Sequence, residues 1–244
     1  MLSHLKKIAK QIHSISPISF SRNETYDRLT KKIIQGLTKS NGSCIDIGAH
    51  EGKILQCMLR YLPNTTHYAF EPIPILFERL KIKFANKAII SATAIGNENS
   101  TSNFNLVLTN MAYSGLNKRA YDKAETDTTI QVQTAKLDSI VPISEKISLI
   151  KIDVEGAELL VLKGAKNTIN NSKPLILFEC GKAGGDAYHF TANDVYDLLS
   201  NDYKYSIYTL NNWLQKKEST NKKQFNYYFD TGKEFFFLAA PNHL

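Results

Sequence analysis

Apolar runs alternate with amphipathic segments along most of the chain. The short apolar runs predict buried strands, which occupy residues 43–47, 67–70, 88–94, 147–152 and 175–178. The segments with helical spacing predict helices at residues 24–37, 53–61, 74–84 and 157–170. This alternation predicts an α/β fold with a mostly parallel sheet and helices on both of its faces.

The pattern changes in two places. Residues 104–108 and 130–134 alternate apolar and polar positions, which predicts two exposed strands around the polar loop 109–129. We interpret this β-hairpin as an insertion at the sheet edge and as a lid. After a predicted helix at 193–199, residues 205–210 and 234–239 predict a closing pair of strands.

The length of 244 residues suits one large domain with elaborations. We predict a helical N-terminal extension at residues 1–40 and a main domain at 41–244. Apolar residues at positions 2, 5, 8, 12 and 15 recur at helical spacing, so this stripe packs on the domain or a partner subunit, or lies on a membrane surface. The stripe therefore allows a homo-oligomer as well as a monomer. We expect neither a secretory signal nor a membrane span.

The cysteines and the charge restrict the class of protein. Cys44, Cys57 and Cys180 lack the spacing of a metal site, and two of them lie in apolar strands, which predicts reduced core residues of a cytoplasmic protein. The net charge is +7 and the isoelectric point about 9.1, which suits a nucleic-acid partner or an anionic small substrate. The basic residues are scattered, however, so we expect a solvated surface and no nucleic-acid partner.

The most informative segment is Cys-Ile-Asp-Ile-Gly-Ala-His-Glu-Gly at residues 44–52, a predicted strand that enters a glycine-bearing turn. Gly48 and Gly52 allow a ligand to approach the backbone. Asp46 stands where a dinucleotide fingerprint has its first glycine, which disfavours a pyrophosphate and a nicotinamide-dependent oxidoreductase. The carboxylate suits S-adenosylmethionine, which carries a sulfonium and an amino group. Glu71, at the end of the next strand, can hold ribose hydroxyls.

Further acids follow other predicted strands, where ligands of open α/β sheets bind. Asp153 and Glu155 follow the strand at 147–152, and Glu179 follows the strand at 175–178. Three roles are open to this cluster: a general base for a hydroxyl proton, ligands to a divalent cation, or hydrogen bonds to a sugar-like substrate.

A glycine-rich segment at residues 180–189 follows the last of these acids and predicts a flexible loop beside the site. Lys182, Asp186, Tyr188 and His189 could contact a substrate from this loop. His189 could act as a base, because an imidazole titrates near neutral pH.

Four segments together resemble the FkbM family of S-adenosylmethionine-dependent methyltransferases; they are residues 44–52, 69–72, 137–139 and the Ile-Lys-Ile-Asp-Val-Glu-Gly-Ala-Glu block at 150–158. The resemblance spans residues 42–179. It implies a class I methyltransferase (Rossmann-like) domain at residues 41–244, with seven strands and a closing antiparallel hairpin. It also implies a cofactor site made of Asp46, Gly48, His50, Gly52, Glu71, Pro72 and Ala94, the last near the adenine.

The resemblance further implies O-methylation of a sugar hydroxyl, on a nucleotide sugar or a precursor of a bacterial surface polysaccharide. Asp153, Glu155 and Glu179 are then expected at the methyl-transfer centre, with His189 as another candidate base. By analogy with catechol-type O-methyltransferases, Asp153 and Glu179 could hold Mg²⁺. The alternative of a nucleic-acid-modifying methyltransferase lacks the Asn/Asp-Pro-Pro-Tyr/Phe motif for an exocyclic amine.

Overall fold

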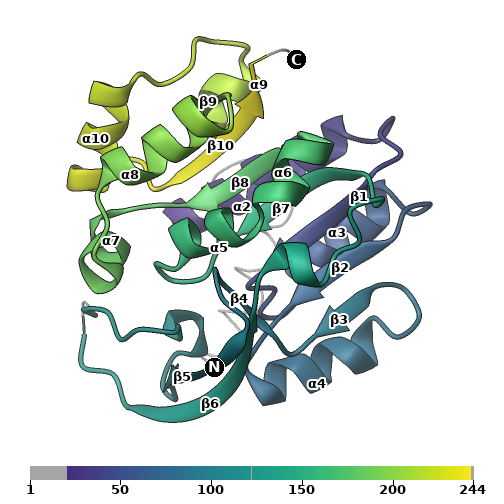
Figure 1. The fold of residues 1–244 in the computed structure, drawn as a ribbon, viewed down its shortest axis with the longest axis vertical. Helices are drawn as coiled ribbons and strands as arrows, with labels where there is room; N and C mark the ends of the chain where they lie inside the picture. The colour runs from purple at the N-terminus through teal and green to yellow at the C-terminus, as the bar shows by residue number, and fades with distance from the viewer. Residues whose placement is uncertain (1–20, 122, 243–244) are drawn as a thin grey trace, which may run out of the picture.

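A seven-stranded sheet forms the centre of the computed structural model, which describes residues 21–121 and 123–242 (Figure 1). Its strand order is β3-β2-β1-β7-β8-β10-β9. These strands are β3 (Ile89–Ser91), β2 (His67–Phe70), β1 (Ser43–Ile47), β7 (Ile147–Ile152), β8 (Leu175–Glu179), β10 (Phe236–Pro241) and β9 (Tyr205–Thr209). The first five run parallel, and β10 is antiparallel to both of its neighbours. The predicted α/β class and the closing antiparallel hairpin are confirmed.

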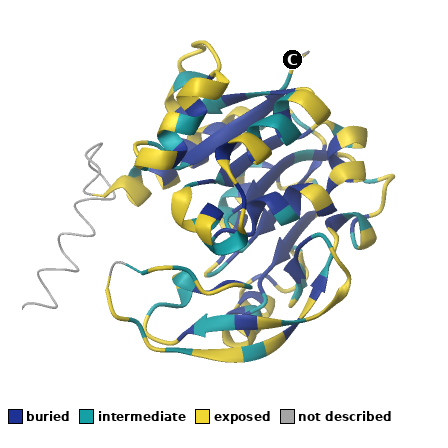
Figure 2. Cartoon of the chain, turned by 60° about the vertical axis from the view of Figure 1, so that its left-hand side comes forward, coloured by how far each residue is buried: buried dark blue, intermediate teal, exposed yellow. Residues whose placement is uncertain are grey.

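Helices cover both faces of this sheet (Figure 1). The first face carries α2 (Arg22–Gly36), α3 (Lys53–Tyr61) and α9 (Leu210–Leu214). The opposite face carries α5 (Glu158–Gly164), α6 (Lys166–Ser172), α8 (Ala192–Asp197) and α10 (Lys222–Thr231). Helix α4 (Pro74–Lys83) contacts β3 near the sheet edge. The sheet is buried along most of its length, while the outer sides of the helices are exposed (Figure 2).

Helix α2 begins where its sequence provides a cap. Ser21 accepts a hydrogen bond from the backbone of Glu24, and the Glu24 side chain accepts one from Ser21, which satisfies two of the free amides at the helix start. Its apolar stripe, which includes Leu29 and Ile33, is buried against the sheet. The apolar stripe predicted at positions 2–15 lies outside the described residues.

The prediction of one strand at residues 88–94 is wrong. The chain leaves the main sheet after β3 and pairs again at β4 (Ala94–Ile95), which runs parallel to β6 (Asp127–Ala135). With β5 (Ser100–Val107) these strands form a second sheet of order β4-β6-β5. The predicted hairpin is therefore present and longer than expected. Hydrophobic side chains of this insertion pack on α4 in a cluster of their own.

The single helix predicted at residues 157–170 is two helices, α5 and α6, which meet at Ala165. Asp138, in the 3-10 turn η2 (Leu137–Ser139), accepts hydrogen bonds from the backbone amides of Asn167 and Thr168. This carboxylate gives α6 its own N-terminal cap and allows the change of direction.

The prediction of a flexible loop at residues 180–189 is also wrong, because most of the segment is helix α7 (Lys182–Tyr188). Its glycines serve close packing. A Cβ at Gly184 would touch the backbone of Gly156, and one at Gly185 would meet the ring of Phe229. Glycine therefore lets this helix lie directly on the turn after β7 and on α10.

The remaining segments complete the domain. A π turn, η3 (Leu198–Asp202), follows α8, and a 3-10 turn, η1 (Met111–Tyr113), lies in the insertion. Cys44 and Cys180 are buried and all three cysteines are free, as predicted. None of the helices in residues 21–121 and 123–242 has the length and hydrophobicity needed to cross a bilayer.

Gly164 provides a test of the contact between α5 and the insertion. A Cβ at this position would collide with the carbonyl oxygen of Gly96, so we expect Gly164→Ala to lower the free energy of unfolding by about 1–3 kcal/mol. The matched control is Gly36→Ala at the end of α2, where no atom lies within 4 Å of the new Cβ. Urea unfolding measures both, and equal effects would contradict the close contact.

Candidate functional site

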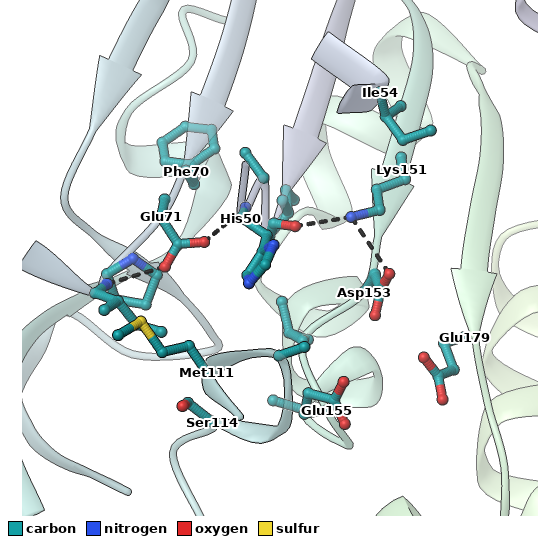
Figure 3. A pocket seen from close by; sticks show the side chains of 18 of the residues that line it. His50, Ile54, Phe70, Glu71, Met111, Ser114, Lys151, Asp153, Glu155 and Glu179 are labelled. Atoms are coloured by element: carbon teal, nitrogen blue, oxygen red, sulfur yellow. Dashed lines mark hydrogen bonds and ion pairs between the residues drawn. The ribbon is translucent and has the colours of Figure 1, made fainter. Parts of the chain in front are cut away.

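A cavity of about 620 Å³ opens at the carboxyl ends of the parallel strands (Figure 3). Its wall comes from the turn after β1, the ends of β2, β7 and β8, the insertion, and helix α2. In Figure 3, Glu71 lies at one end of the cavity, while Asp153, Glu155 and Glu179 face one another at the other. His50 and Lys151 lie between these two ends.

The turn after β1 is held in a conformation that its glycines permit. Gly48 and Gly52 have positive φ angles of 74° and 72°. The amides of Gly48 and Ala49 both donate to the Phe70 carbonyl oxygen, at 3.0 and 3.1 Å, which ties the turn to β2. A Cβ on Gly48 would collide with the Asp153 carbonyl oxygen. The predicted importance of Gly48 thus has a packing cause as well: it lets the turns after β1 and β7 touch.

Lys151 is a site residue that our sequence interpretation missed. Its side chain is 6% exposed and its Nζ donates to the Gly48 carbonyl oxygen at 2.8 Å. The same Nζ lies 3.3 Å from Asp46 Oδ1 and 3.5 Å from Asp153 Oδ2. Burial alone would lower the pKa of Lys151, but the two carboxylates outweigh it and raise the pKa. The available signal was a lysine inside an apolar strand, which requires a buried acid nearby.

Asp46 is that acid. It lies beside Lys151 in the register of β1 and β7, and its Oδ2 accepts the Leu55 amide at 3.0 Å, in the first turn of α3. Asp46 is fully buried and is not among the residues that line the cavity. Its position suits a residue that holds Lys151 and α3 in place.

Glu71 lines the cavity and is held by backbone amides. Its Oε2 accepts the His50 amide at 2.8 Å, and its Oε1 accepts the Ile73 amide at 3.0 Å. Burial raises the pKa of Glu71, and these two hydrogen bonds oppose the rise. Each carboxylate oxygen has a further lone pair, so the fixed carboxylate can accept two hydrogen bonds from a ligand.

The residues around Glu71 form an apolar wall. Ala94 lies in β4 and lines the cavity with Ile73, while Phe104, Met111 and Leu116 reach it from the insertion. Pro72 and His50 also line the cavity. The apolar wall suits a flat, mostly apolar group of a ligand, next to a polar group that can donate to Glu71.

Gly52 does not line the cavity. It is the N-cap of α3 and lies against Leu80 and Phe84.

Three carboxylates converge at the other end of the cavity. One oxygen each from Asp153, Glu155 and Glu179 lie within 4.8 Å of one another. Burial raises the pKa of Glu179 well above its usual value, and repulsion from Asp153 and Glu155 adds to the rise. Glu179 thus favours its protonated form more strongly than an exposed glutamate does, and a hydrogen bond with Asp153 adds to this effect.

Glu155 is held in an unusual conformation by the insertion. Its φ is 59°, in the left-handed region, and its carboxylate pairs with the guanidinium of Arg119. Burial and then repulsion from Asp153 raise its pKa to about 8, although Arg119 opposes the rise. Glu158 does not line the cavity and instead accepts the amides of Val154 and Gly156, which shapes the turn.

The residues predicted in segment 180–189 lie outside the cavity. His189 is exposed at the C-terminal end of α7, and Lys182 pairs with Asp186 on its surface. Tyr188 instead accepts the backbone amide of Asn117 at 2.9 Å, so it anchors the insertion loop. His189 therefore does not line the cavity, although its helix packs on the turn after β7 through Gly184.

Helix α2 is a second part of the site that our interpretation missed. Asn23, Tyr26, Asp27 and Thr30 all line the cavity. Tyr26 donates to Glu234 at 2.6 Å, which fixes the helix to the segment before β10. The polar positions of an amphipathic helix carry no signal for this role, because they are normally in solvent.

Comparison with known proteins gives a family match. A model of the methyltransferase FkbM domain matches residues 46–207. A search of curated protein sequences found no match. Among solved structures, methyltransferase FkbM from Methylobacillus flagellatus KT is similar, with 18% identity, a TM-score of 0.48, and coverage of 82% of this chain. This chain spans 43% of the length of that one.

Two further solved structures show lower similarity. The plantazolicin methyltransferase BpumL in complex with SAH has 14% identity and a TM-score of 0.46, with coverage of 96% of this chain and 88% of that one. The precorrin-6y C5,15-methyltransferase from Geobacter metallireducens GS-15 has 11% identity and a TM-score of 0.37, with coverage of 73% and 71%.

The buried acids predict a pH dependence of stability. Burial raises the pKa of Glu158 to about 7, above its usual 4.5, so the folded state holds a proton that the unfolded state releases. The free energy of unfolding should therefore fall as pH rises from about 5 to 8. Glu158→Gln keeps an acceptor for both amides without the charge, and should flatten this slope.

The control for this measurement is Glu78→Gln, which removes a charge from an exposed side chain of α4. The free energy of unfolding of this variant should change with pH as steeply as that of the wild-type protein. Urea unfolding at several pH values gives the slopes, and an equally steep slope in Glu158→Gln would contradict the assignment to this residue.

Proposed function

The chain belongs to the FkbM methyltransferase family, and from that membership we propose that this S-adenosylmethionine-dependent enzyme methylates a sugar hydroxyl. The observation that carries the proposal is the cavity itself. It joins a fixed carboxylate, Glu71, to a cluster of three acids at the strand ends, and so provides a place for a hydroxyl-bearing cofactor beside a place for proton removal.

The residues of the cavity fit S-adenosylmethionine. The Glu71 carboxylate has free lone pairs for ribose hydroxyls, and the apolar wall near Ala94 suits the adenine. Five further acids also line the cavity and favour a ligand with a sulfonium and an amino group; they are Asp27, Glu51, Asp153, Glu155 and Glu179. When bound, this cofactor supplies an electrophilic methyl group.

Each predicted cofactor residue receives a role in this proposal. Glu71, His50, Pro72 and Ala94 line the cavity and contact the cofactor directly. Gly48 lets the chain turn beneath it, and Gly52 starts α3. Asp46 does not contact the cofactor in this proposal; it holds Lys151 and α3 in position.

Asp153 is the proposed general base. The Nζ of Lys151 lies 3.5 Å from its Oδ2 and helps to fix the position of this carboxylate. A hydrogen bond with Asp153 is among the causes that raise the pKa of Glu179, so Glu179 is placed to orient this carboxylate. Asp153 would accept the proton of the acceptor hydroxyl as that hydroxyl oxygen takes the methyl group, with the carbon–sulfur bond broken and the neutral thioether as leaving group.

The same carboxylates offer a second mechanism. Asp153 and Glu179, with Glu155, present oxygens close enough together to hold a divalent cation such as Mg²⁺. A cation there would acidify the hydroxyl and leave less work for a base. Against this mechanism stands the burial of Glu179, which raises its pKa and so disfavours the ionised form that a cation needs.

The acceptor class is proposed from the family resemblance and from charge. A sugar on a nucleotide, or a cytoplasmic precursor of a surface polysaccharide, matches a polar site rich in acids. The net charge of +7 helps to collect an anionic sugar nucleotide. A panel of nucleotide sugars and glycans with radiolabelled S-adenosylmethionine tests this class, and transfer to a nucleobase or a protein amine alone would refute it.

We propose that residues 41–244 form the methyltransferase domain and residues 1–40 an extension. Helix α2 of this extension lines the cavity through Asp27 and Thr30, so residues 22–36 contribute to the site.

Glu71→Ala tests the cofactor site. Loss of the carboxylate leaves ribose hydroxyls unpaired, so binding of S-adenosylhomocysteine should weaken by about 1–3 kcal/mol in calorimetry. Glu78→Ala on exposed α4 is the control and should bind normally. Normal affinity in Glu71→Ala would remove this residue from the cofactor site.

Asp153→Asn tests the base. The amide keeps the shape but cannot accept the proton, so turnover should fall by about 10²-fold or more while cofactor affinity survives. Chelator treatment separates the two mechanisms. Loss of activity that Mg²⁺ restores indicates a cation, whereas unchanged activity indicates general base catalysis. Near-normal turnover in Asp153→Asn would show that this carboxylate is only structural.

A further inference from the structure

Arg119 carries a positive charge from the insertion into the acid-rich end of the cavity. It lines the cavity, and its side chain is only 18% exposed. Its guanidinium carbon lies 4.9 Å from the centre of the Tyr113 ring, a cation–π contact that fixes the direction of the side chain. Tyr113 in turn stacks on Tyr121, so the position is built by the insertion itself.

The hydrogen-bonding capacity of Arg119 is only partly used. One terminal nitrogen, Nη2, pairs with Glu155, while the Nε–H is buried and has no hydrogen-bond partner among the described residues. A buried donor without a partner costs free energy. A guanidinium presents its donors as a fork that matches the two oxygens of a carboxylate or phosphate. The free half of this fork therefore indicates a ligand.

The other basic residues that line the cavity are unsuited to this role. Lys151 is held by the Gly48 carbonyl oxygen and by its two acids. Lys53 is 72% exposed and pairs with Glu51 at the α3 side of the cavity. Among the Lys and Arg residues in the described part of the cavity wall, Arg119 is thus the one with an unpaired donor at the acid-rich end.

The present partner of Arg119 is held at a cost. Glu155 occupies a left-handed backbone conformation, at a φ of 59°, and sits beside Asp153 and Glu179. The three side chains crowd one another, because one oxygen of each lies within 4.8 Å of the other two. A carboxylate in such surroundings is a poor permanent counter-ion, and another anion can replace it.

We propose that Arg119 binds an acidic group of the acceptor, a carboxylate or a phosphate, and that Glu155 fills its place until the acceptor arrives. This inference rests on the proposed function, since it specifies the class of sugar: one that is acidic or phosphorylated. The new pair uses both sides of the guanidinium fork. It also frees Glu155 from its partner at the moment when the acceptor hydroxyl reaches Asp153.

The test uses the full-length protein saturated with S-adenosylhomocysteine. Calorimetry at low salt measures three matched probes: methyl glucoside, methyl glucuronide and glucose 1-phosphate. The two anionic probes should bind at least about tenfold more tightly than the neutral one, and their order distinguishes a carboxylate from a phosphate. Arg119→Met should remove the difference in affinity between the anionic and neutral probes. Arg119→Lys keeps the charge but lacks the paired donors of a guanidinium, so it should retain a small part of that difference.

Two variants separate a specific site from general charge. Lys118→Met is the matched control, because it removes one positive charge from the same loop at an exposed residue that pairs with Asp127 outside the cavity. It should preserve the preference for anions. Glu155→Gln should strengthen binding of the anionic probes about threefold or more and leave the neutral probe unchanged, because Arg119 then has no competing carboxylate.

The outcomes are distinct. If S-adenosylhomocysteine does not bind at all, the proposed function fails. If it binds but the anionic probes show no advantage over the neutral one, or Arg119→Met and Lys118→Met behave alike, this inference fails and the proposed function stands. Weaker binding of anions by Glu155→Gln would also overturn it, since Glu155 would then be a partner of the acceptor and not its competitor.

Discussion

The buried ammonium of Lys151 is the contact on which the site depends. It joins the Gly48 carbonyl oxygen, Asp46 and Asp153, and so ties the turn after β1 to the end of β7. Two carboxylates and a carbonyl oxygen satisfy a charge that could not otherwise be buried. The ammonium also offsets part of the negative charge that Asp46 and Asp153 bring to this end of the cavity. Without this cation, the acids at the strand ends would repel one another more strongly.

The sequence predicted the parts of the fold that depend on local pattern. Strands β1, β2 and β7 and helix α3 have the predicted bounds, because burial of a short apolar run and the turn glycines determine them. The breaks at residues 92–93 and at Ala165 depend on contacts between distant segments. The pairing of β4 with β6 and the cap from Asp138 are such contacts, and no local pattern encodes them.

The candidate site was predictable to a similar degree. Strand-end acids could be identified because strands of one parallel sheet bring their carboxyl ends together, and Glu71, Asp153 and Glu179 do line one cavity. Burial of Asp46 behind Lys151, and the approach of Arg119 from a distant loop, depend on side-chain packing. Glycines at 184 and 185 indicated flexibility, yet they serve close contact between a helix and its neighbours, since the same residue type permits both.

The insertion has a hydrophobic cluster that is separate from the two main clusters on the faces of the large sheet. This smaller cluster includes Phe104 and Val132 of the insertion and Ile73 at the start of α4. Such a subdomain can open as one cooperative unit while the sheet stays folded. It can also accumulate substitutions that would be ruinous within the sheet. The insertion and the large sheet are therefore stabilised by largely different side-chain contacts.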